Sequence, residues 1–433
     1  MKARYFRYLF EQQEETLIHS GYVYDRFGEC ALHYIYMYGG SRGPKDGSID
    51  SDRVQNGSDG LPEEIDLFVV AGYRLSTVRQ ILRIITQHRV RIMILPYLTP
   101  VQRLVLVQDM QENGWSEPQA LHYLEDPYLY LKNRGISQIF FLYQNTAGVA
   151  EDLRDSRDGM FFEDLDPDIT ELIAEMEGYP VPVMRAGYFR ENGWMFYFGV
   201  YGTDIRKMSA FTREYFSRAE NFCPESDDPG EDYRNQMHHL ADRYREAFGR
   251  IPVAAVVMFA GPTEVEHRYY DSCMIEREYE RERCRMEREN TLDGGYYKCT
   301  IACLRNRDYD TMQHHKNNKE MRFGILLLGF PDLKQYFNEI FGRFWKIHPK
   351  VRILNVPGNG ETEYWNPHIL DISEGENSQN RIYWIQGRSI HTSSQVIQDI
   401  VMSSVYNRLI PVDEMRGVCF SGYLLPKEDG RWC

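Results

Sequence analysis

The sequence predicts an α/β protein with four layers, in the order helix, sheet, sheet, helix. Three observations support this class. Largely apolar stretches such as IDLFVV (65–70) and FGILLLG (323–329) are typical of strands buried on both faces. Amphipathic helical patterns follow them, which is the order of parallel β-α-β units. The alternation occurs in two parts of the chain, so each half needs its own sheet and its own covering helices.

The first half, 1–204, begins with three short β patterns and continues with alternating strands and helices. The β patterns cover 3–10, 16–25 and 30–40, and a polar loop, 41–60, follows them. The next elements are a strand at 65–70, a helix at 76–88 with Ser76 or Thr77 as N-cap, a strand at 91–98, helices at 99–114 and 116–135, and a strand at 137–144. Loop and helix are expected across 146–178, followed by a hairpin at 183–202 with its turn at Glu-Asn-Gly.

The interval 205–320 is predicted to be an irregular, charged insertion that contributes one core strand at about 251–260. It also contains a helical pattern near 235–249 and a charge-dense run, EREYERERCRMEREN (276–290). That run is either a solvated helix or an arm that binds a partner. The second half of the domain, 321–433, repeats the α/β order. Its strands are expected at 323–329, 351–358, 381–387 and 417–425, and its helices at 332–346 and 393–409.

Composition places the chain among globular proteins and argues against two classes of function. Of its 433 residues, 42% are hydrophobic and 26% are charged. The 64 acidic residues outnumber the 50 basic ones and give a net charge of −14, which makes direct nucleic-acid binding a weak hypothesis. No apolar run reaches the ~20 residues of a membrane helix, and no secretory cleavage site follows the N-terminus. We therefore expect a cytoplasmic protein with reduced cysteines.

The segment DLFVVAGYRLSTVRQIL (66–82) frames a site but supplies few groups to fill it. A buried strand runs through a turn into a helix, a common position for catalytic residues, yet Asp66 is its only acidic residue and it has no histidine or cysteine. The order of the motifs in the chain resembles the metallo-β-lactamase fold, in particular its bacterial metallohydrolase branch. In that family this turn carries His-x-His-x-Asp-His, whose side chains bind two metal ions.

The resemblance implies that this chain has lost its metal ligands. Gly72, Arg74, Ser76 and Thr77 occupy the four ligand positions of the turn. Glycine has no side chain, arginine is a permanent cation, and neutral hydroxyls bind divalent transition metals poorly. The other motifs of the family are matched by YGGS with Tyr38 in place of Asp, GFPDL with Phe330, VPGNGE with Gly358 and Asn359 in place of two histidines, and SIHTSS, which retains His391. One imidazole cannot hold two metal ions, so no metal cofactor is expected.

What the resemblance implies for function is a catalytically inactive protein that serves as a binding or scaffold subunit of a multi-protein complex. RNA-processing nucleases of this fold pair an active chain with an inactive one, and the bacterial branch is common in antiviral defence systems. Three segments are candidate docking surfaces for another protein subunit: the acidic segment 151–177, the charged arm 276–289 and the aromatic hairpin 188–201.

Two alternative functions remain open. The chain could be a sensor that binds an anionic small molecule or nucleotide in the vacated pocket, with Arg74 at its mouth. It could instead be a hydrolase with metal ligands rebuilt from Asp25, Asp66 and His391.

Other groups of reactive residues carry weaker signals. Asp25, Glu29 and Asp66 could bind Mg²⁺ through oxygen, although ordinary carboxylates at loops and strand ends explain them equally well. Cys30 and His391 could form a nucleophilic pair, but no known nucleophile motif surrounds them. Zinc-type residues also occur at looser spacing than a zinc knuckle, namely Cys284, Cys299, Cys303, His314 and His315. The adjacent His238 and His239 point to different faces of a helix and are expected at the surface.

Overall fold

A computed structural model describes most of the strands and helices of the chain. The residues it describes are 5–13, 16–25, 27, 29–39, 63–112, 114, 117–143, 158–202, 204–219, 229–248, 254–262, 268–272, 324–329, 333–344, 351–374, 382–387, 392–403, 408–412 and 418–425. The polar loop 41–60, the charged arm 276–289, the zinc-type residues between 284 and 315, Phe330 and His391 lie outside these ranges.

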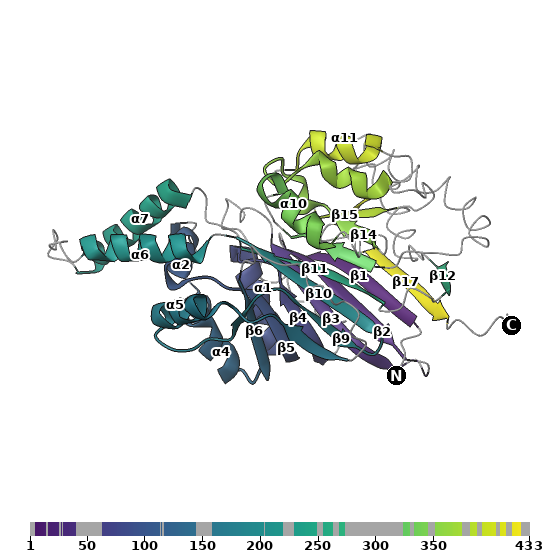
Figure 1. Cartoon of the computed structure of the whole chain (residues 1–433), viewed down its shortest axis with the longest axis horizontal. Coiled ribbons are helices and arrows are strands. Elements are labelled where there is room, and N and C mark those ends of the chain that lie inside the picture. The colour runs from purple at the N-terminus through teal and green to yellow at the C-terminus, as the bar shows by residue number, and fades with distance from the viewer. Residues whose placement is uncertain are drawn as a thin grey trace.

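Two mixed β-sheets form the centre of the molecule, and helices lie on both outer sides (Figure 1). The first sheet consists, in spatial order, of β12 (Arg268–Ser272), β17 (Val418–Leu425), β1 (Tyr5–Gln13), β2 (Thr16–Tyr24), β3 (Cys30–Gly39), β4 (Glu64–Val70), β5 (Arg89–Pro96), β6 (Gln138–Leu142) and β8 (Val183–Met184). The second consists of β16 (Arg408–Val412), β15 (Tyr383–Gly387), β14 (Val351–Asn355), β13 (Gly324–Leu327), β11 (Ala255–Pro262), β10 (Trp194–Tyr201), β9 (Gly187–Glu191) and β7 (Gly159–Phe162).

Each sheet combines an antiparallel part with a parallel part. In the first sheet β1, β2 and β3 are antiparallel neighbours, whereas β3 to β6 and β8 are parallel. In the second sheet β7, β9, β10, β11 and β13 are antiparallel, whereas β13 to β16 are parallel. Strands β7, β9 and β10 therefore belong to the second sheet, together with β11 and β13 to β16, whereas β8, β12 and β17 complete the first sheet. The α/β class predicted from the sequence is confirmed at this level.

Aromatic side chains fill the space between the two sheets. The ring of Tyr34 on β3 meets Phe196 on β10 edge to face, with centroids 4.7 Å apart. Phe6 on β1 packs on Trp194, with centroids 5.5 Å apart. These side chains are 2% exposed or less. The high aromatic content of the sequence therefore serves the inter-sheet core, where large rings bury much apolar area.

The helices bury the outer faces of the sheets and complete the four layers. The first sheet is covered by α1 (Leu75–Gln87), α3 (Pro118–Glu125), α4 (Pro127–Asn133) and α5 (Pro167–Glu177), together with part of α2 (Pro100–Glu112). The second sheet is covered by α10 (Leu333–Phe344), α11 (Ser394–Ser403) and the 3-10 helix η5 (Pro367–Glu374). Each layer arises because an apolar helix face must be buried against an apolar sheet face.

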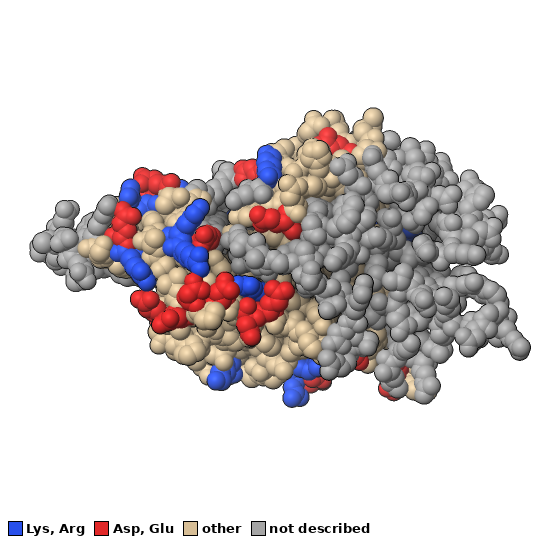
Figure 2. All heavy atoms as spheres, in the orientation of Figure 1, with Lys and Arg blue, Asp and Glu red and all other residues tan. Residues whose placement is uncertain are grey.

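A helical pair, α6 (Ile205–Ala219) and α7 (Pro229–Phe248), packs on α2 and extends to one end of the molecule (Figure 1). Exposed ion pairs join α6 to α5, with Arg206 2.6 Å from Asp168 and Arg213 3.4 Å from Glu175. Acidic and basic side chains are accordingly interspersed over this end of the visible face (Figure 2). Two carboxylates in the described part of the acidic segment 151–177, those of Asp168 and Glu175, thus pair with α6.

Local sequence signals explain several boundaries, and three predictions need correction. The β9–β10 turn is formed by Asn192 and Gly193, with φ of 53° and 78°, as the Glu-Asn-Gly sequence predicts. The predicted N-cap of α1 is wrong: the helix begins at Leu75, and its N-cap Arg74 makes no side-chain cap hydrogen bond. The single helix predicted at 116–135 is two helices, because Asp126 caps α4 by accepting from Leu129 N, just before a proline.

The third correction concerns the hairpin 188–201, which was expected to be a docking surface. Every side chain of β10 is buried, and β9 lies between β7 and β10 in the second sheet. The aromatic residues of this hairpin belong to the core. Strand β10 carries aromatic residues on both of its faces. One face packs against the first sheet and the other against the covering helices, so both are buried.

Candidate functional site

Seven of the nine positions predicted for the lost metal site lie where the two sheets meet at the carboxyl ends of their parallel strands. We call this region the carboxyl-edge junction; it comprises 38–39, 71–77, 329, 356–364, 387 and 392. The ends of β3 and β4 lie side by side, because those strands are parallel, and β13, β14 and β15 end together in the second sheet. The seven predicted positions are Tyr38, Gly72, Arg74, Ser76, Thr77, Gly358 and Asn359.

The two sheets touch directly at this edge. A Cβ atom added to Gly329, which follows β13, would lie 3.1 Å from the Cβ atom of Ala71, which follows β4. The backbone N–H of Val256 on β11 donates to Ala71 O at 2.7 Å. The hydroxyl of Tyr36 donates to Val256 O at 2.8 Å and also lies 3.3 Å from Leu327 O. Strand ends that are distant in sequence are therefore fixed against each other.

Tyr38 and Asn359 form the central contact of the junction. The Tyr38 hydroxyl donates to Asn359 Oδ1 at 3.1 Å, and both residues are 1% exposed. Burial raises the pKa of Tyr38 far above its ordinary value, opposed by a hydrogen bond to Asn355, so the phenol is neutral and donates. Two positions that correspond to metal ligands in the resemblance are thus bonded to each other.

Asn359 has a backbone conformation that few residues adopt. Its φ is 52°, between Gly358 at 55° and Gly360 at 89°. Asparagine tolerates this left-handed region better than most residues. The three residues make the tight turn that follows β14, and Gly387 permits the amide to approach, since a Cβ atom there would lie 2.8 Å from Asn359 Oδ1.

Arg74 and Tyr364 form the second contact between the sheets. Arg74 Nη2 donates to the Tyr364 hydroxyl at 3.1 Å. The Tyr364 ring covers Gly358, because a Cβ atom on that glycine would lie 2.3 Å from the ring. Burial raises the pKa of Tyr364, while the charge of Arg74 lowers it and those of Glu361 and Glu363 raise it. The space beside Gly358 is therefore filled by an aromatic ring and a guanidinium group.

On the opposite face of β3, Gly39 lets helix α1 approach closely. A Cβ atom on Gly39 would lie 2.2 Å from Thr77 Oγ1 and 2.8 Å from Ser76 Oγ. Thr77 is fully buried and Ser76 is 8% exposed. These two hydroxyls pack against the end of β3 rather than projecting into a solvent-filled cleft.

Several buried polar atoms near the junction have no hydrogen-bond partner among the described residues. Sequence reasoning did not identify Thr16, Gln80 or Glu361, because no pattern of residue types marks a missing partner. Thr16 is the pairing partner of Gly39, and Gln80 lies one helical turn after Thr77. The atoms are Thr16 Oγ1, Thr77 Oγ1, Gln80 Nε2 and Oε1, Asn359 Nδ2 and Glu361 Oε1.

His391 lies outside the described residues, but its neighbour Thr392 reaches the junction. The Thr392 hydroxyl donates to Asn359 O at 2.9 Å, and Ser393 N donates to Gly360 O at 2.9 Å. The segment before α11 thus returns to the turn after β14. Phe330, the remaining predicted position, is also outside the described residues and directly follows Gly329.

The carboxylates proposed for a rebuilt metal site lie at the other end of the first sheet. Asp66 is near the start of β4, roughly 20 Å from the turn at Gly72 for a strand rise of ~3.3 Å per residue. Its carboxylate is 3.2 Å from Arg91 Nε and accepts from His33 N at 2.9 Å. The hypothesis that Asp66 shares a site with the junction residues is therefore contradicted by the strand geometry.

Asp25 and Glu29 belong to the turn between β2 and β3, which is also at this distant end. Asp25 Oδ1 accepts from the backbone N–H groups of Phe27 and Glu29, at 2.7 and 3.0 Å, so it stabilises the turn. Cys30 begins β3 at this end of the sheet. The residue is exposed, but the neighbouring atoms partly shield its thiol from water, and this desolvation raises the pKa of the thiol. Its predicted partner, His391, lies outside the described residues.

His238 and His239 lie on the exposed part of α7, as predicted. His238 Nδ1 is 3.0 Å from Glu112 Oε1 on α2, and His239 Nδ1 is 3.4 Å from the Tyr215 hydroxyl on α6. The two rings thus contact different helices. Within the described ranges, no group of three or more His, Cys, Asp or Glu side chains is arranged to hold a metal ion.

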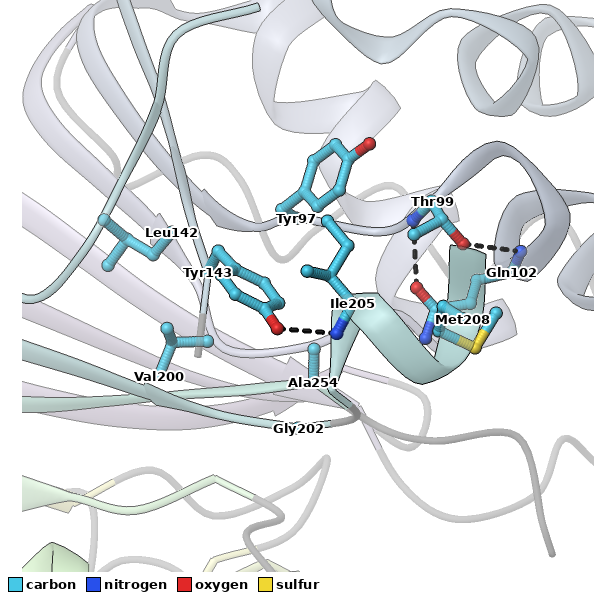
Figure 3. A pocket seen from close by; sticks show the side chains of 10 residues that line it. All are labelled: Tyr97, Thr99, Gln102, Leu142, Tyr143, Val200, Gly202, Ile205, Met208 and Ala254. Atoms are coloured by element: carbon cyan, nitrogen blue, oxygen red, sulfur yellow. Dashed lines mark hydrogen bonds between the residues drawn. The ribbon is translucent and has the colours of Figure 1, made fainter. Parts of the chain in front are cut away.

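A small hollow lies further along the same edge, beyond the ends of β5 and β6 (Figure 3). The Tyr143 hydroxyl accepts from Ile205 N, the first residue of α6, at 2.6 Å. Thr99 and Gln102 bond to each other, with Thr99 N donating to Gln102 Oε1 at 2.9 Å and Gln102 N donating to Thr99 Oγ1 at 3.3 Å. The polar groups of the hollow satisfy one another, so it presents little unmet chemistry to a ligand.

Comparison with known proteins gives no identity. No family model matches the chain, and no curated protein matches its sequence. Among the described helices, none has the length and apolar character needed to cross a membrane.

Proposed function

We propose that this chain is a metallo-β-lactamase-like protein without catalytic metal chemistry, whose function is to bind as a subunit of a multi-protein complex. The observation that carries the proposal is the hydrogen bond between Tyr38 and Asn359. Both occupy positions that match metal-binding motifs of the family, and both lie at the edge where the two sheets meet. The bond engages the Tyr38 hydroxyl and Asn359 Oδ1, which are the atoms that would have to coordinate a bridging cation from these positions.

The second cross-sheet contact supports the same conclusion. Arg74 brings a positive charge to the junction and donates to Tyr364. A guanidinium is permanently protonated, so it repels divalent cations and cannot act as a ligand. Thr77 and Ser76 are packed against Gly39, where neutral hydroxyls offer weak ligation. In this proposal the fold of the family is kept while the metal ligands are replaced. A protein of this fold without metal ions can still bind another protein.

Metal analysis of the purified protein tests the first part of the proposal. We expect elemental analysis to find zinc, manganese and iron each far below one equivalent per chain. Stoichiometric metal that survives dialysis without chelator would contradict the proposal.

Restoring the family motif gives a sharper test of the same positions. The variant with Gly72→His, Arg74→His, Ser76→Asp and Thr77→His is expected to gain about one equivalent of zinc, since a second ligand set remains incomplete. The three-residue variant that leaves Ser76 unchanged is the matched control and should bind more weakly. If the restored variant binds no more zinc than the wild type, these four positions are not the ligand positions of the family.

The subunit role is tested by the assembly state of the chain isolated from its own cells. We expect a complex of fixed stoichiometry in native mass spectrometry, stable through size-exclusion chromatography. Recovery of only the isolated monomer under gentle, low-salt conditions would refute the role. The identity of the co-purifying subunits tests the role in antiviral defence, because we expect them to be components of such a system.

A further inference from the structure

Two buried side chains at the carboxyl-edge junction present polar atoms that no described group satisfies. Asn359 is 1% exposed, and its Nδ2 atom has no acceptor among the described residues. Glu361 is 6% exposed, and within the same part of the chain its Oε1 atom has no donor. Buried polar atoms are nearly always satisfied in folded proteins, by protein, ordered water or ligand. A free amide donor and a free carboxylate oxygen two residues apart therefore indicate a missing polar partner.

The charges around these atoms define what the partner must be. Arg74 reaches the junction from the first sheet and Glu361 from the second, and both act on the pKa of Tyr364 between them. A purely anionic ligand would meet the repulsion of Glu361. A purely cationic one would meet that of Arg74. A ligand that carries both charges satisfies the two sides at once.

We propose that the junction binds a small zwitterion with the chemistry of a free amino acid. Its carboxylate would accept from the Asn359 amide and from Arg74, and its ammonium group would donate to Glu361 Oε1. Charge-assisted hydrogen bonds of both signs give such a ligand selectivity over its singly charged fragments. The inference rests on the proposed function, since it requires a junction without metal ions, and it names the class of ligand that this junction binds.

Thermal shift and calorimetry with simple probes test the proposal. Glycine, β-alanine and γ-aminobutyrate separate the two charges by increasing distance, whereas acetate and methylammonium each carry one of them. At equal ionic strength we expect at least one zwitterion to raise the melting temperature more than acetate and methylammonium combined. If the three zwitterions do no better than their fragments, the proposal is overturned.

Variants at the junction assign any binding to the named groups. Arg74→Met and Asn359→Ala are expected to weaken the best zwitterion by about tenfold, which is the loss of one charge-assisted contact. Glu361→Gln should abolish the preference for the zwitterion, because it removes both the site for ammonium and the repulsion of acetate. Glu363→Gln, at an exposed side chain of the same segment, removes an equal charge and is the matched control, which should change binding far less than Glu361→Gln.

A result in which Glu361→Gln retains the full preference for the zwitterion would refute the assignment. Each variant is first compared with the wild type in urea unfolding, so that a loss of binding is read only in folded protein. The probes are titrated into protein dialysed against a chelator, and metal content is measured separately. Metal content and zwitterion binding are therefore read in separate measurements, so a failure of the proposed function can be told from a failure of this inference.

Discussion

The hydroxyl of Tyr38, at the end of β3, donates to Asn359 Oδ1, in the turn after β14, across the boundary between the two sheets. Both residues are almost completely buried, so water cannot replace the bond when one partner is removed. The contact therefore joins the halves of the domain at the same place where the resemblance puts metal ions.

Tyr38→Phe is expected to lower the free energy of unfolding by about 1–3 kcal/mol, because it leaves the buried side-chain oxygen of Asn359, Oδ1, without this donor. Urea unfolding followed by circular dichroism measures the change. Tyr128→Phe, on a half-buried ring of α4, is the control and should change the value by less than about 0.5 kcal/mol. Equal effects of the two substitutions would mean that the Tyr38 hydroxyl contributes nothing specific.

Gly39→Ala is expected to destabilise the protein by about 1–3 kcal/mol, because the new methyl group would overlap the Thr77 hydroxyl and displace α1. Thr77→Ala in the same chain removes the overlapping oxygen and should recover part of the loss. A double-mutant cycle measures this coupling. Strictly additive effects would show that the close approach of Gly39 to Thr77 does not constrain the helix.

The ion pair between Arg103 on α2 and Glu177 at the end of α5 is buried, with 10% and 6% of the two side chains exposed. Arg103 donates to both carboxylate oxygens, at 2.9 and 2.8 Å, and the Tyr97 hydroxyl also donates to Glu177. Glu177→Leu alone should cost about 3–5 kcal/mol, because it leaves a buried guanidinium unpaired.

Adding Arg103→Met to Glu177→Leu is expected to recover most of that stability, as apolar residues can replace a buried pair. Breaking the exposed pair by Glu175→Ala, opposite Arg213, should change stability by no more than about 0.5 kcal/mol. The prediction fails if the double variant is as unstable as Glu177→Leu.

Stability should fall as the pH is lowered, because two histidines are buried in their neutral form. Burial lowers the pKa of His19 to about 3 and that of His33 to about 4, from an ordinary value of 6.5. Below pH 6.5 the unfolded chain binds these protons and the folded chain does not. Each histidine then reduces the free energy of unfolding by roughly 1.4 kcal/mol per pH unit, until the folded pKa is reached.

Unfolding measured between pH 7.5 and pH 5 tests this slope. His19→Leu should reduce the slope by the contribution of one proton, and a second substitution, His33→Gln, should reduce it further. A wild-type slope that neither substitution alters would show that these two side chains do not titrate as proposed.

The strand-helix-strand order around 65–98 could be read from the sequence because its apolar periodicity has a single solution. The N-cap of α1 could not. Ser76 and Thr77 are good N-cap residues by themselves. In the structure they lie inside the first turn of α1, packed against Gly39, and Arg74 is the N-cap. Tertiary packing thus overrides a local preference. The break between α3 and α4 is different, because a local signal for it is present in the sequence. Asp126-Pro127 is a typical start of a helix, yet the single helix predicted at 116–135 runs through it.

One contact of the candidate site joins two residues that the sequence singles out, whereas other groups of the site have no pattern in the sequence. Motif order places Tyr38 and Asn359 at strand ends, and the structure brings them together. The distance between two residues depends on how their strands pair, however. Asp66 and Asp25 resemble site residues in sequence, but they lie at the end of the first sheet that is opposite to the junction. Unsatisfied atoms, such as Glu361 Oε1, have no sequence signature because they depend on what the surrounding side chains fail to supply.

Strand β17 pairs with β1 in antiparallel register, from Val418 opposite Phe10 to Tyr423 opposite Tyr5. Because β17 comes more than 400 positions after β1, ribosomal synthesis leaves one edge of β1 open until nearly all of these residues have emerged. An open edge can capture another strand, and a closure this distant in sequence is intrinsically slow. The unpaired edge of β1 is therefore open to mispairing during translation, and we expect chains that end before residue 418 to aggregate more readily than the full chain.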